Sequence, residues 1–267
     1  MSKFGFGFLR LPLDENKQID IEETKQMVDL YMQNGFNFFD TAHGYMEQRC
    51  EQAFKTCVAD RYSRDKYILS NKLTGNYFST EDDIYKLFQE QLDNCGVEYF
   101  DYYLLHNFAS KRYNSFVNVN ANAINAISKL KAEGKIKKIG FSFHDNADFL
   151  DKVLNEFPEL EVVLIQFNYI DFESQDIQSR RLYEVCQKHN KEILVMEPVK
   201  GGKLANLPPN ARECFDKLGN NSSSSYALRF VADFKDVSRV LSGMSSLEQM
   251  QDNLRTFVNY KQLENKG

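Results

Sequence analysis

The sequence predicts an α/β protein that folds as a single (β/α)8 TIM barrel domain over residues 1–267. Segments with the apolar pattern of strands alternate eight times with segments that repeat apolar residues at helical spacing, which is the order expected of a closed parallel barrel. The length of 267 residues also suits one barrel, because such domains run to about 250 residues. We therefore expect no second domain.

The predicted elements follow one another in strict alternation. Short runs rich in aromatic and branched side chains predict strands near residues 4–9, 36–39, 67–71, 101–105, 137–141, 162–166, 193–197 and 237–241. Amphipathic stretches predict helices near residues 21–34, 47–60, 81–95, 121–134, 146–156, 177–189, 223–233 and 246–259.

The segment 201–222 interrupts this alternation. It contains Gly201-Gly202 and Pro208-Pro209, and a run of four serines begins at its last residue, Ser222. These features predict a long loop after the seventh strand. Loops of that length at a barrel mouth are usually functional. No G-x-G-x-x-G fingerprint follows a strand, so a Rossmann mode of dinucleotide binding is not supported. Gly5-Phe6-Gly7 is instead expected in a turn at the floor or the mouth of the barrel.

The composition narrows the choice of partners and compartment. The net charge is -5, so a broad basic field for a phosphate backbone is missing and nucleic acid is not expected as a partner. No apolar run approaches the roughly 20 residues needed to span a bilayer, and the N-terminus shows no secretory signal. We expect a cytoplasmic protein that does not bind membranes and acts on a small molecule.

The five cysteines do not suggest a metal site. Their number is odd and no CxxC pair occurs, so neither a disulfide framework nor a cysteine metal knuckle is indicated. We expect buried, reduced thiols and no bound metal.

Four polar residues stand at the ends of the second, third and fourth predicted strands. They are Asp40, Tyr45, Lys72 and His106. In a parallel barrel these strand ends meet at one mouth, so residues about 30 positions apart can share a pocket. Asp40 can neutralise a buried Lys72, and an ammonium beside Tyr45 is expected to lower the pKa of its phenol. His106 is expected to orient a substrate oxygen or to share the proton, which makes the set suited to proton transfer.

These residues also carry a family resemblance that covers nearly the whole chain. The segments Phe39–Tyr45, Asn71-Lys72-Leu73 and Leu104-Leu105-His106 resemble those around the catalytic Asp, Tyr, Lys and His of the aldo-keto reductases. The resemblance implies a (β/α)8 oxidoreductase that transfers hydride between a nicotinamide cofactor and a carbonyl or alcohol substrate. Tyr45 would be its general acid and base.

The same resemblance implies where the cofactor binds. Ser142 and Gln166 would hold the nicotinamide carboxamide, and the loops after strands seven and eight would hold the pyrophosphate and adenosine. The residues implied in those loops are Glu197, Pro198, Lys200, Gly201 and Gly202, then Ser242, Gly243, Met244, Ser245, Gln249 and Asn253. Independently, barrels commonly bind phosphate between these two loops. NADPH is the expected cofactor, with NADH as the alternative.

Three departures from the family pattern bear on these expectations. Phe143 and His144 follow Ser142, where many relatives have Asn, and no Lys or Arg occurs from Ser242 to Leu254, where relatives often hold the cofactor's 2′-phosphate. The segments Gly140–Asp145 and Met196–Gly202 resemble a microbial branch that often carries a C-terminal iron-sulfur extension. The chain ends at Gly267 without the cysteines of such an extension, so we expect no cluster in this polypeptide.

Two other functions fit parts of the pattern. His43, His106 and His144 all follow predicted strands, as ligands of a metal-dependent barrel hydrolase would, but Lys72 would repel a cation there. A regulatory protein of reductase fold, which binds nucleotide with little turnover, would share the fold without the activity.

Overall fold

The computed structural model describes residues 3–217, 219 and 221–258. Its strands are β1 (Phe4–Gly7), β2 (Phe38–Asp40), β3 (Ile68–Thr74), β4 (Phe100–Phe108), β5 (Ile136–Phe143), β6 (Val162–Gln166), β7 (Glu192–Met196) and β8 (Val237–Gly243). Every neighbouring pair is parallel, and β8 pairs with β1, so the sheet closes into a barrel in chain order. The predicted (β/α)8 TIM barrel is confirmed.

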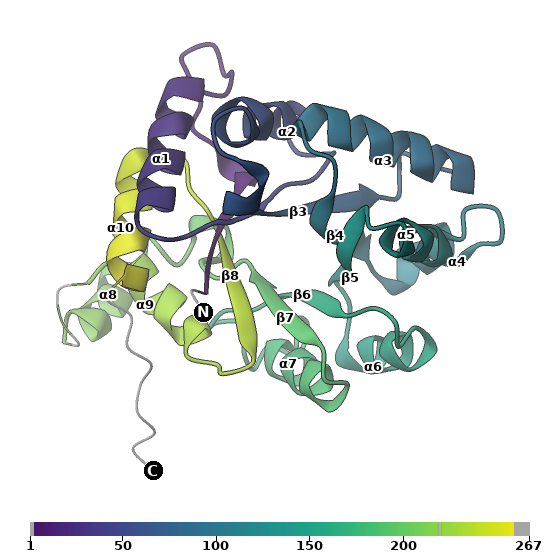
Figure 1. Cartoon of the computed structure of the whole chain (residues 1–267). Helices are drawn as coiled ribbons and strands as arrows, with labels where there is room; N and C mark the ends of the chain where they lie inside the picture. The colour runs from purple at the N-terminus through teal and green to yellow at the C-terminus, as the bar shows by residue number, and fades with distance from the viewer. Residues whose placement is uncertain (1–2, 218, 220, 259–267) are drawn as a thin grey trace.

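Helices surround this barrel as an outer ring (Figure 1). They are α1 (Ile21–Gln33), α2 (Arg49–Phe54), α3 (Glu81–Cys95), α4 (Tyr113–Val117), α5 (Ala123–Ala132), α6 (Ala147–Glu156), α7 (Ser179–Lys188), α8 (Pro209–Asp216), α9 (Ser223–Ala232) and α10 (Leu247–Val258). The predicted helix 47–60 is divided, because a π-helical turn at Lys55–Ala59 continues α2. The last predicted helix, 246–259, includes position 259, which lies outside the described residues.

Two sequence predictions about local structure are wrong. The segment 201–222 is not one long loop, because α8 lies within it, starting with Pro209 in its first turn; the fixed φ of proline suits that position. Gly5-Phe6-Gly7 is part of β1 rather than a turn, and the strand ends in a short 3-10 helix at Phe8–Arg10.

The core has two layers, as the alternation of strand side chains requires. One set fills the barrel interior, namely Phe38, Tyr102, Leu104, Val162, Leu164, Leu194 and Leu241. A larger set, which includes Phe39, packs between the strands and the helices. Gly140 shows how tightly the barrel closes: a Cβ atom there would lie 2.0 Å from the carbonyl oxygen of Val162, so only glycine allows β5 to pair with β6.

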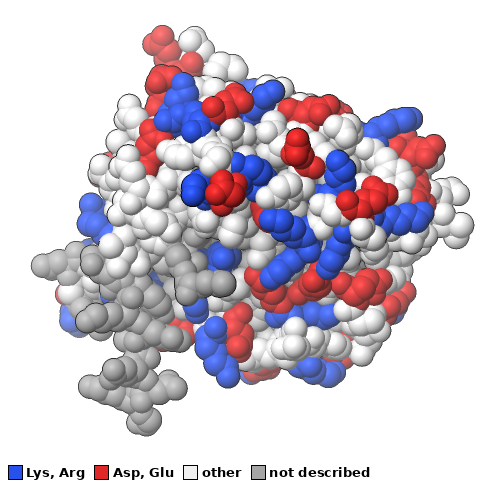
Figure 2. Space-filling model, viewed as in Figure 1, with Lys and Arg blue, Asp and Glu red and all other residues white. Residues whose placement is uncertain are grey.

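Charged side chains of both signs are interspersed on the face shown in Figure 2. Among the described residues, no helix is long and apolar enough to cross a membrane. Of the five cysteines, Cys214 is exposed, contrary to the prediction of buried thiols, and the other four are buried.

Candidate active site

A buried ion pair joins the end of β2 to the second half of β3. Asp40 is the last residue of β2, and Lys72 lies inside β3 rather than after it, because that strand continues to Thr74. Lys72 Nζ is 2.7 Å from Asp40 Oδ2 and donates to the carbonyl oxygen of Thr41, also at 2.7 Å. The Lys72 side chain is 1% exposed, so the ammonium needs this anion to remain charged. Burial acts to lower the pKa of Lys72, but Asp40 and Tyr45 outweigh it and the pKa is raised.

Tyr45 lies over this ion pair on the loop between β2 and α2. Lys72 Nζ is 4.8 Å from the centroid of the tyrosine ring, and the His106 ring meets it edge-on at 5.7 Å. Burial raises the pKa of the Tyr45 phenol more than Lys72 lowers it. The sequence expectation of a lowered pKa is therefore wrong, because desolvation of the phenolate outweighs the attraction of the ammonium.

His106 lies inside β4, directly opposite Thr74 of β3 in the parallel register. Its Nδ1 atom is 2.8 Å from the Thr74 hydroxyl. Burial, with smaller effects from Lys72, His144 and Arg112, lowers the pKa of His106 to about 3. The imidazole is consequently neutral at physiological pH. The structure thus brings all four predicted residues together at one end of the barrel.

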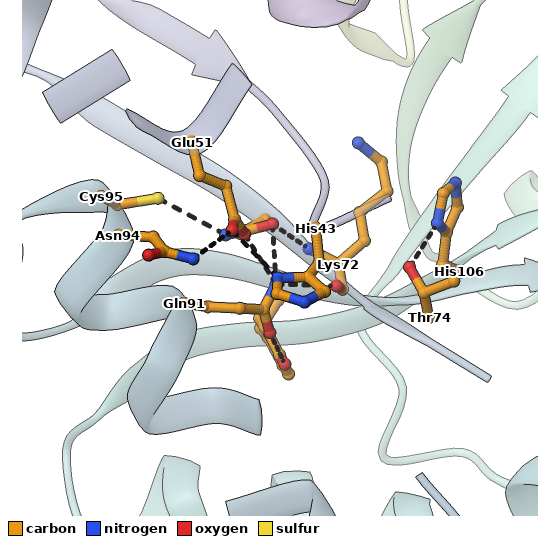
Figure 3. Close-up of polar contacts among 10 residues, drawn as sticks. His43, Glu51, Lys72, Thr74, Gln91, Asn94, Cys95 and His106 are labelled. Atoms are coloured by element: carbon orange, nitrogen blue, oxygen red, sulfur yellow. Dashed lines mark hydrogen bonds and ion pairs between the residues drawn. The ribbon is translucent and has the colours of Figure 1, made fainter. Parts of the chain in front are cut away.

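A second polar cluster lies behind these residues and escaped the sequence analysis (Figure 3). At its centre is Glu51 of α2, whose side chain is fully buried. One carboxylate oxygen accepts from Asn71 Nδ2 at 2.8 Å and from Gln91 Nε2 at 3.1 Å. The other lies 3.0 Å from His43 Nδ1 and accepts from Asn94 Nδ2 at 3.2 Å. We call this the Glu51 cluster: His43, Glu51, Asn71, Gln91 and Asn94.

The Glu51 cluster connects the two chain segments that carry the candidate catalytic groups. His43 precedes Tyr45 by two residues, and Asn71 directly precedes Lys72, whose backbone N–H donates to Asn71 Oδ1 at 2.8 Å. Gln91 Nε2 also donates to the carbonyl oxygen of Lys72 at 3.1 Å. Figure 3 shows the Lys72 side chain extending away from the cluster. A glutamate on an amphipathic helix looks like a surface residue in the sequence, so nothing signalled this role.

At β5 and β6, the residues implied to hold the carboxamide already have partners within the protein. Ser142 is buried in β5 and its hydroxyl accepts from the backbone N–H of Asn107 at 2.7 Å. Gln166 ends β6 and its Nε2 donates to Asp171 Oδ2 at 2.8 Å. Asp171 also accepts from Asn168 at 2.7 Å and forms an ion pair with Lys200. Asp171 was not predicted, yet it links strand six to the loop after β7.

In the loops after β7 and β8, the predicted residues divide between exposed and inward-facing positions. Ser242 and Asn253 are buried and bonded to each other at 2.7 Å, and Met244 is also buried. Gly201, Gly202, Gly243, Ser245 and Gln249 are exposed. Glu197 is partly exposed directly after β7, and Pro198 beside it is buried.

His43 and His106 have different hydrogen-bond partners. His43 is bonded to Glu51, and His106 to Thr74. Within the described part of the chain, no group of three His, Cys, Asp or Glu side chains is placed to hold a metal ion.

The chain is similar in sequence and in fold to known proteins. The chain is similar to L-galactose dehydrogenase of Arabidopsis thaliana, with 26% identity over 249 residues that cover 86% of this chain and 76% of the relative. It is similar to the NADH-specific methylglyoxal reductase of Escherichia coli (strain K12), with 23% identity over 82% of this chain and 78% of the relative.

The fold is that of a crystal structure of an aldo-keto reductase from Klebsiella pneumoniae in complex with NADPH. The TM-score is 0.76 with 17% identity, and the match covers 96% of this chain and 85% of that one. A sequence model described as "Aldo/keto reductase family" matches residues 3–266. The chain therefore belongs to the aldo/keto reductase family.

Proposed function

We propose that this protein transfers hydride between a nicotinamide cofactor and a carbonyl or alcohol carbon, with Tyr45 exchanging the proton. Membership of the aldo/keto reductase family supports an NAD(P)H-dependent oxidoreductase. The observation that carries the finer proposal is the buried Lys72–Asp40 ion pair beneath the Tyr45 ring, with His106 at the edge of that ring.

The loops after β7 and β8 are suited to the phosphates of such a cofactor. Gly201 and Gly202 have φ angles of 60° and 91° and are exposed, so backbone atoms can approach a phosphate closely. When bound, the cofactor supplies or accepts the hydride. The similar proteins include one described with NADPH and one named as NADH-specific. We propose NADPH as the cofactor, with NADH as the alternative.

Tyr45 is proposed to donate its phenolic proton to the substrate oxygen during reduction. Burial raises the pKa of the phenol, so the hydroxyl carries its proton at neutral pH and is ready to donate it. Once the proton has left, the Lys72 ammonium stabilises the phenolate that remains. Asp40 holds that ammonium at 2.7 Å and so keeps it beneath the ring.

His106 is proposed to orient the substrate oxygen as a neutral hydrogen-bond donor. If the Thr74 hydroxyl donates to Nδ1, 2.8 Å away, the hydrogen of the neutral ring resides on Nε2. That nitrogen can then donate to a carbonyl oxygen, while Tyr45 gives the same oxygen its proton. Thr74 thereby sets the tautomer of the ring.

Replacing the tyrosine tests the proposal. Tyr45→Phe removes the transferable proton and little else, so the reduction of an aromatic aldehyde should slow at least about a hundredfold, in line with general-acid contributions. Cofactor affinity should stay nearly unchanged. Turnover is measured from the loss of reduced nicotinamide absorbance, and affinity by calorimetry.

The matched control is Tyr85→Phe on α3, whose hydroxyl bonds to Glu81 on the same helix; it should turn over like wild type. Turnover of Tyr45→Phe within a few-fold of wild type would exclude Tyr45 as the acid. A wild-type protein that binds the cofactor but reduces no carbonyl in a panel of aldehydes would favour a regulatory role instead.

A further inference from the structure

Arg10 spans the two loops to which the cofactor phosphates are assigned. It ends the 3-10 helix that follows β1, and its side chain crosses the end of β8. The Cβ, Cγ and Cδ atoms of Arg10 lie 3.3 to 3.5 Å from the point that a Cβ atom on Gly243 would occupy. Its Nη2 atom lies 3.4 Å from the corresponding point at Gly201. The guanidinium therefore reaches from β8 to the loop after β7.

The backbone of Arg10 is fixed in this place. Its carbonyl oxygen accepts from the Ser245 hydroxyl at 2.9 Å, and Gly7, three residues earlier, is paired with Gly243 in the sheet. A Cβ atom at Gly243 would crowd the arginine, and one at Gly201 would stand in van der Waals contact with its Nη2 atom. Glycine at both positions thus leaves room for the guanidinium along the mouth.

Among the described residues, none neutralises the charge of Arg10. Across residues 3–217, 219 and 221–258, no carboxylate forms an ion pair with Arg10 and its guanidinium donates no hydrogen bond. Glu197 Oε2 lies 3.5 Å from the point that a Cβ atom on Gly201 would occupy, but it forms no ion pair with Arg10. By contrast, Arg61 and Arg64 each hold an aspartate at 2.7 Å. Lys200, at the start of the loop, is engaged by Asp171.

We infer that Arg10 binds the pyrophosphate of the dinucleotide cofactor, an inference that rests on the proposed function. The planar guanidinium matches phosphate oxygens in a two-point contact, and barrels bind phosphate between the loops that Arg10 spans. The pyrophosphate is favoured over a 2′-phosphate because a carboxylate already occupies the start of α10, where relatives often hold the 2′-phosphate. This carboxylate is Glu23 of α1, whose Oε1 accepts from the Leu247 N–H at 2.8 Å. A second anion would be repelled there.

The test measures the affinity of the whole protein for NADH and NADPH by calorimetry, for wild type, Arg10→Gln and Arg10→Lys. Loss of one charge-assisted contact should weaken both cofactors by roughly ten- to a hundredfold in Arg10→Gln. Arg10→Lys should retain part of the affinity. Affinity should also fall less steeply with salt in Arg10→Gln than in wild type, because one ionic contact is gone.

The matched control is Arg181→Gln, which removes an exposed arginine on α7 that pairs with Asp148; its cofactor affinity should not change. Thermal unfolding of Arg10→Gln should match wild type, since the side chain is exposed. Equal affinity of Arg10→Gln and wild type for both cofactors would overturn the inference. A loss confined to NADPH would overturn the assignment to the pyrophosphate. Failure of wild type to bind either cofactor would instead overturn the proposed function.

Discussion

At the scale of single residues, burial decides the chemistry of the candidate site more than charge does. An ammonium beside a phenol lowers the phenol's pKa in water-exposed surroundings. Around Tyr45 the cost of burying the phenolate is larger, and the pKa is raised despite Lys72. His106 follows the same logic, since burial is the largest cause of its pKa of about 3.

These pKa directions predict a distinctive pH dependence. The charged and titratable groups beside Tyr45 are Asp40, Lys72, Cys50 and His106. Reduction needs the protonated phenol, whose pKa burial raises above its ordinary value, so the reductive kcat should be flat between about pH 6 and 9. Alcohol oxidation needs the phenolate, so its kcat should rise over that range by up to about tenfold per pH unit.

The two pH profiles are measured on the same preparation with saturating cofactor. His106 is neutral throughout that range and adds no step. Cys50, whose pKa burial raises to about 12, adds none either. A fall in the reductive kcat with a midpoint near pH 7 would contradict the raised pKa of Tyr45.

The identities of the catalytic candidates could be predicted from the sequence, but their surroundings could not. Asp40, Lys72 and His106 each stand at the end of a recognisable apolar run, which fixes the mouth at which they meet. Burial depends on contacts from distant segments, so the pKa direction was wrong. Arg10 was missed for the same reason, since its neighbours Gly201 and Gly243 are remote in sequence.

At the scale of elements, the alternation of strand and helix patterns in the sequence predicts the topology of the barrel, but it does not predict where each strand and helix begins and ends. Strands β3 and β4 run on to Thr74 and Phe108, beyond the apolar runs, because the polar residues Lys72 and His106 still pair in the sheet. The sequence does not predict helix α8, because the pair Pro208-Pro209 is typical of a loop. Pro209 in the first turn is instead compatible with a helix start.

Glu23 of α1, whose carboxylate lies at the start of α10, predicts weak discrimination between NADPH and NADH. Glu23 accepts from the Leu247 N–H, in the segment where relatives often bind the 2′-phosphate with a cation. Wild type should prefer NADPH over NADH by less than about a hundredfold, because one charge-assisted contact contributes about 1.5 to 3 kcal/mol. Glu23→Gln removes the repulsion and should raise the NADPH to NADH affinity ratio several-fold.

Calorimetric titration of both cofactors measures that ratio. Glu22→Gln, which alters an exposed carboxylate in the same helical turn, is the matched control and should leave it unchanged. A wild-type preference for NADPH well above a hundredfold would mean that a cation such as Lys203 or Arg255 reaches the 2′-phosphate.

At the scale of the whole molecule, the Glu51 cluster holds the loop of Tyr45 against the strand of Lys72. Glu51→Gln keeps the shape but turns an amide N–H toward the donors of Asn71, Gln91 or Asn94. An unsatisfied buried group costs about 1 to 3 kcal/mol, and more when a charge is involved. The free energy of unfolding should fall by about that amount in a urea titration, and kcat should fall with it.

Glu90→Gln on the exposed face of α3 is the control and should change stability by less than about 0.5 kcal/mol. An unfolding curve for Glu51→Gln that superimposes on wild type would show that the cluster does not stabilise the barrel.

The pairing of β8 with β1 has a consequence for how the chain is made. Val240 N–H donates to the Lys3 carbonyl oxygen at 2.7 Å, and Lys3 Nζ donates to the carbonyl oxygens of Ala232 and Phe234. The hydrogen bond between Val240 and Lys3 cannot form until β8 has been synthesised and has left the ribosome. Until then β1 and β7 each present an open edge, which is a template for pairing with other chains. A chain in which β8 has not yet paired therefore keeps an open seam, and it is exposed to aggregation until that strand closes the barrel.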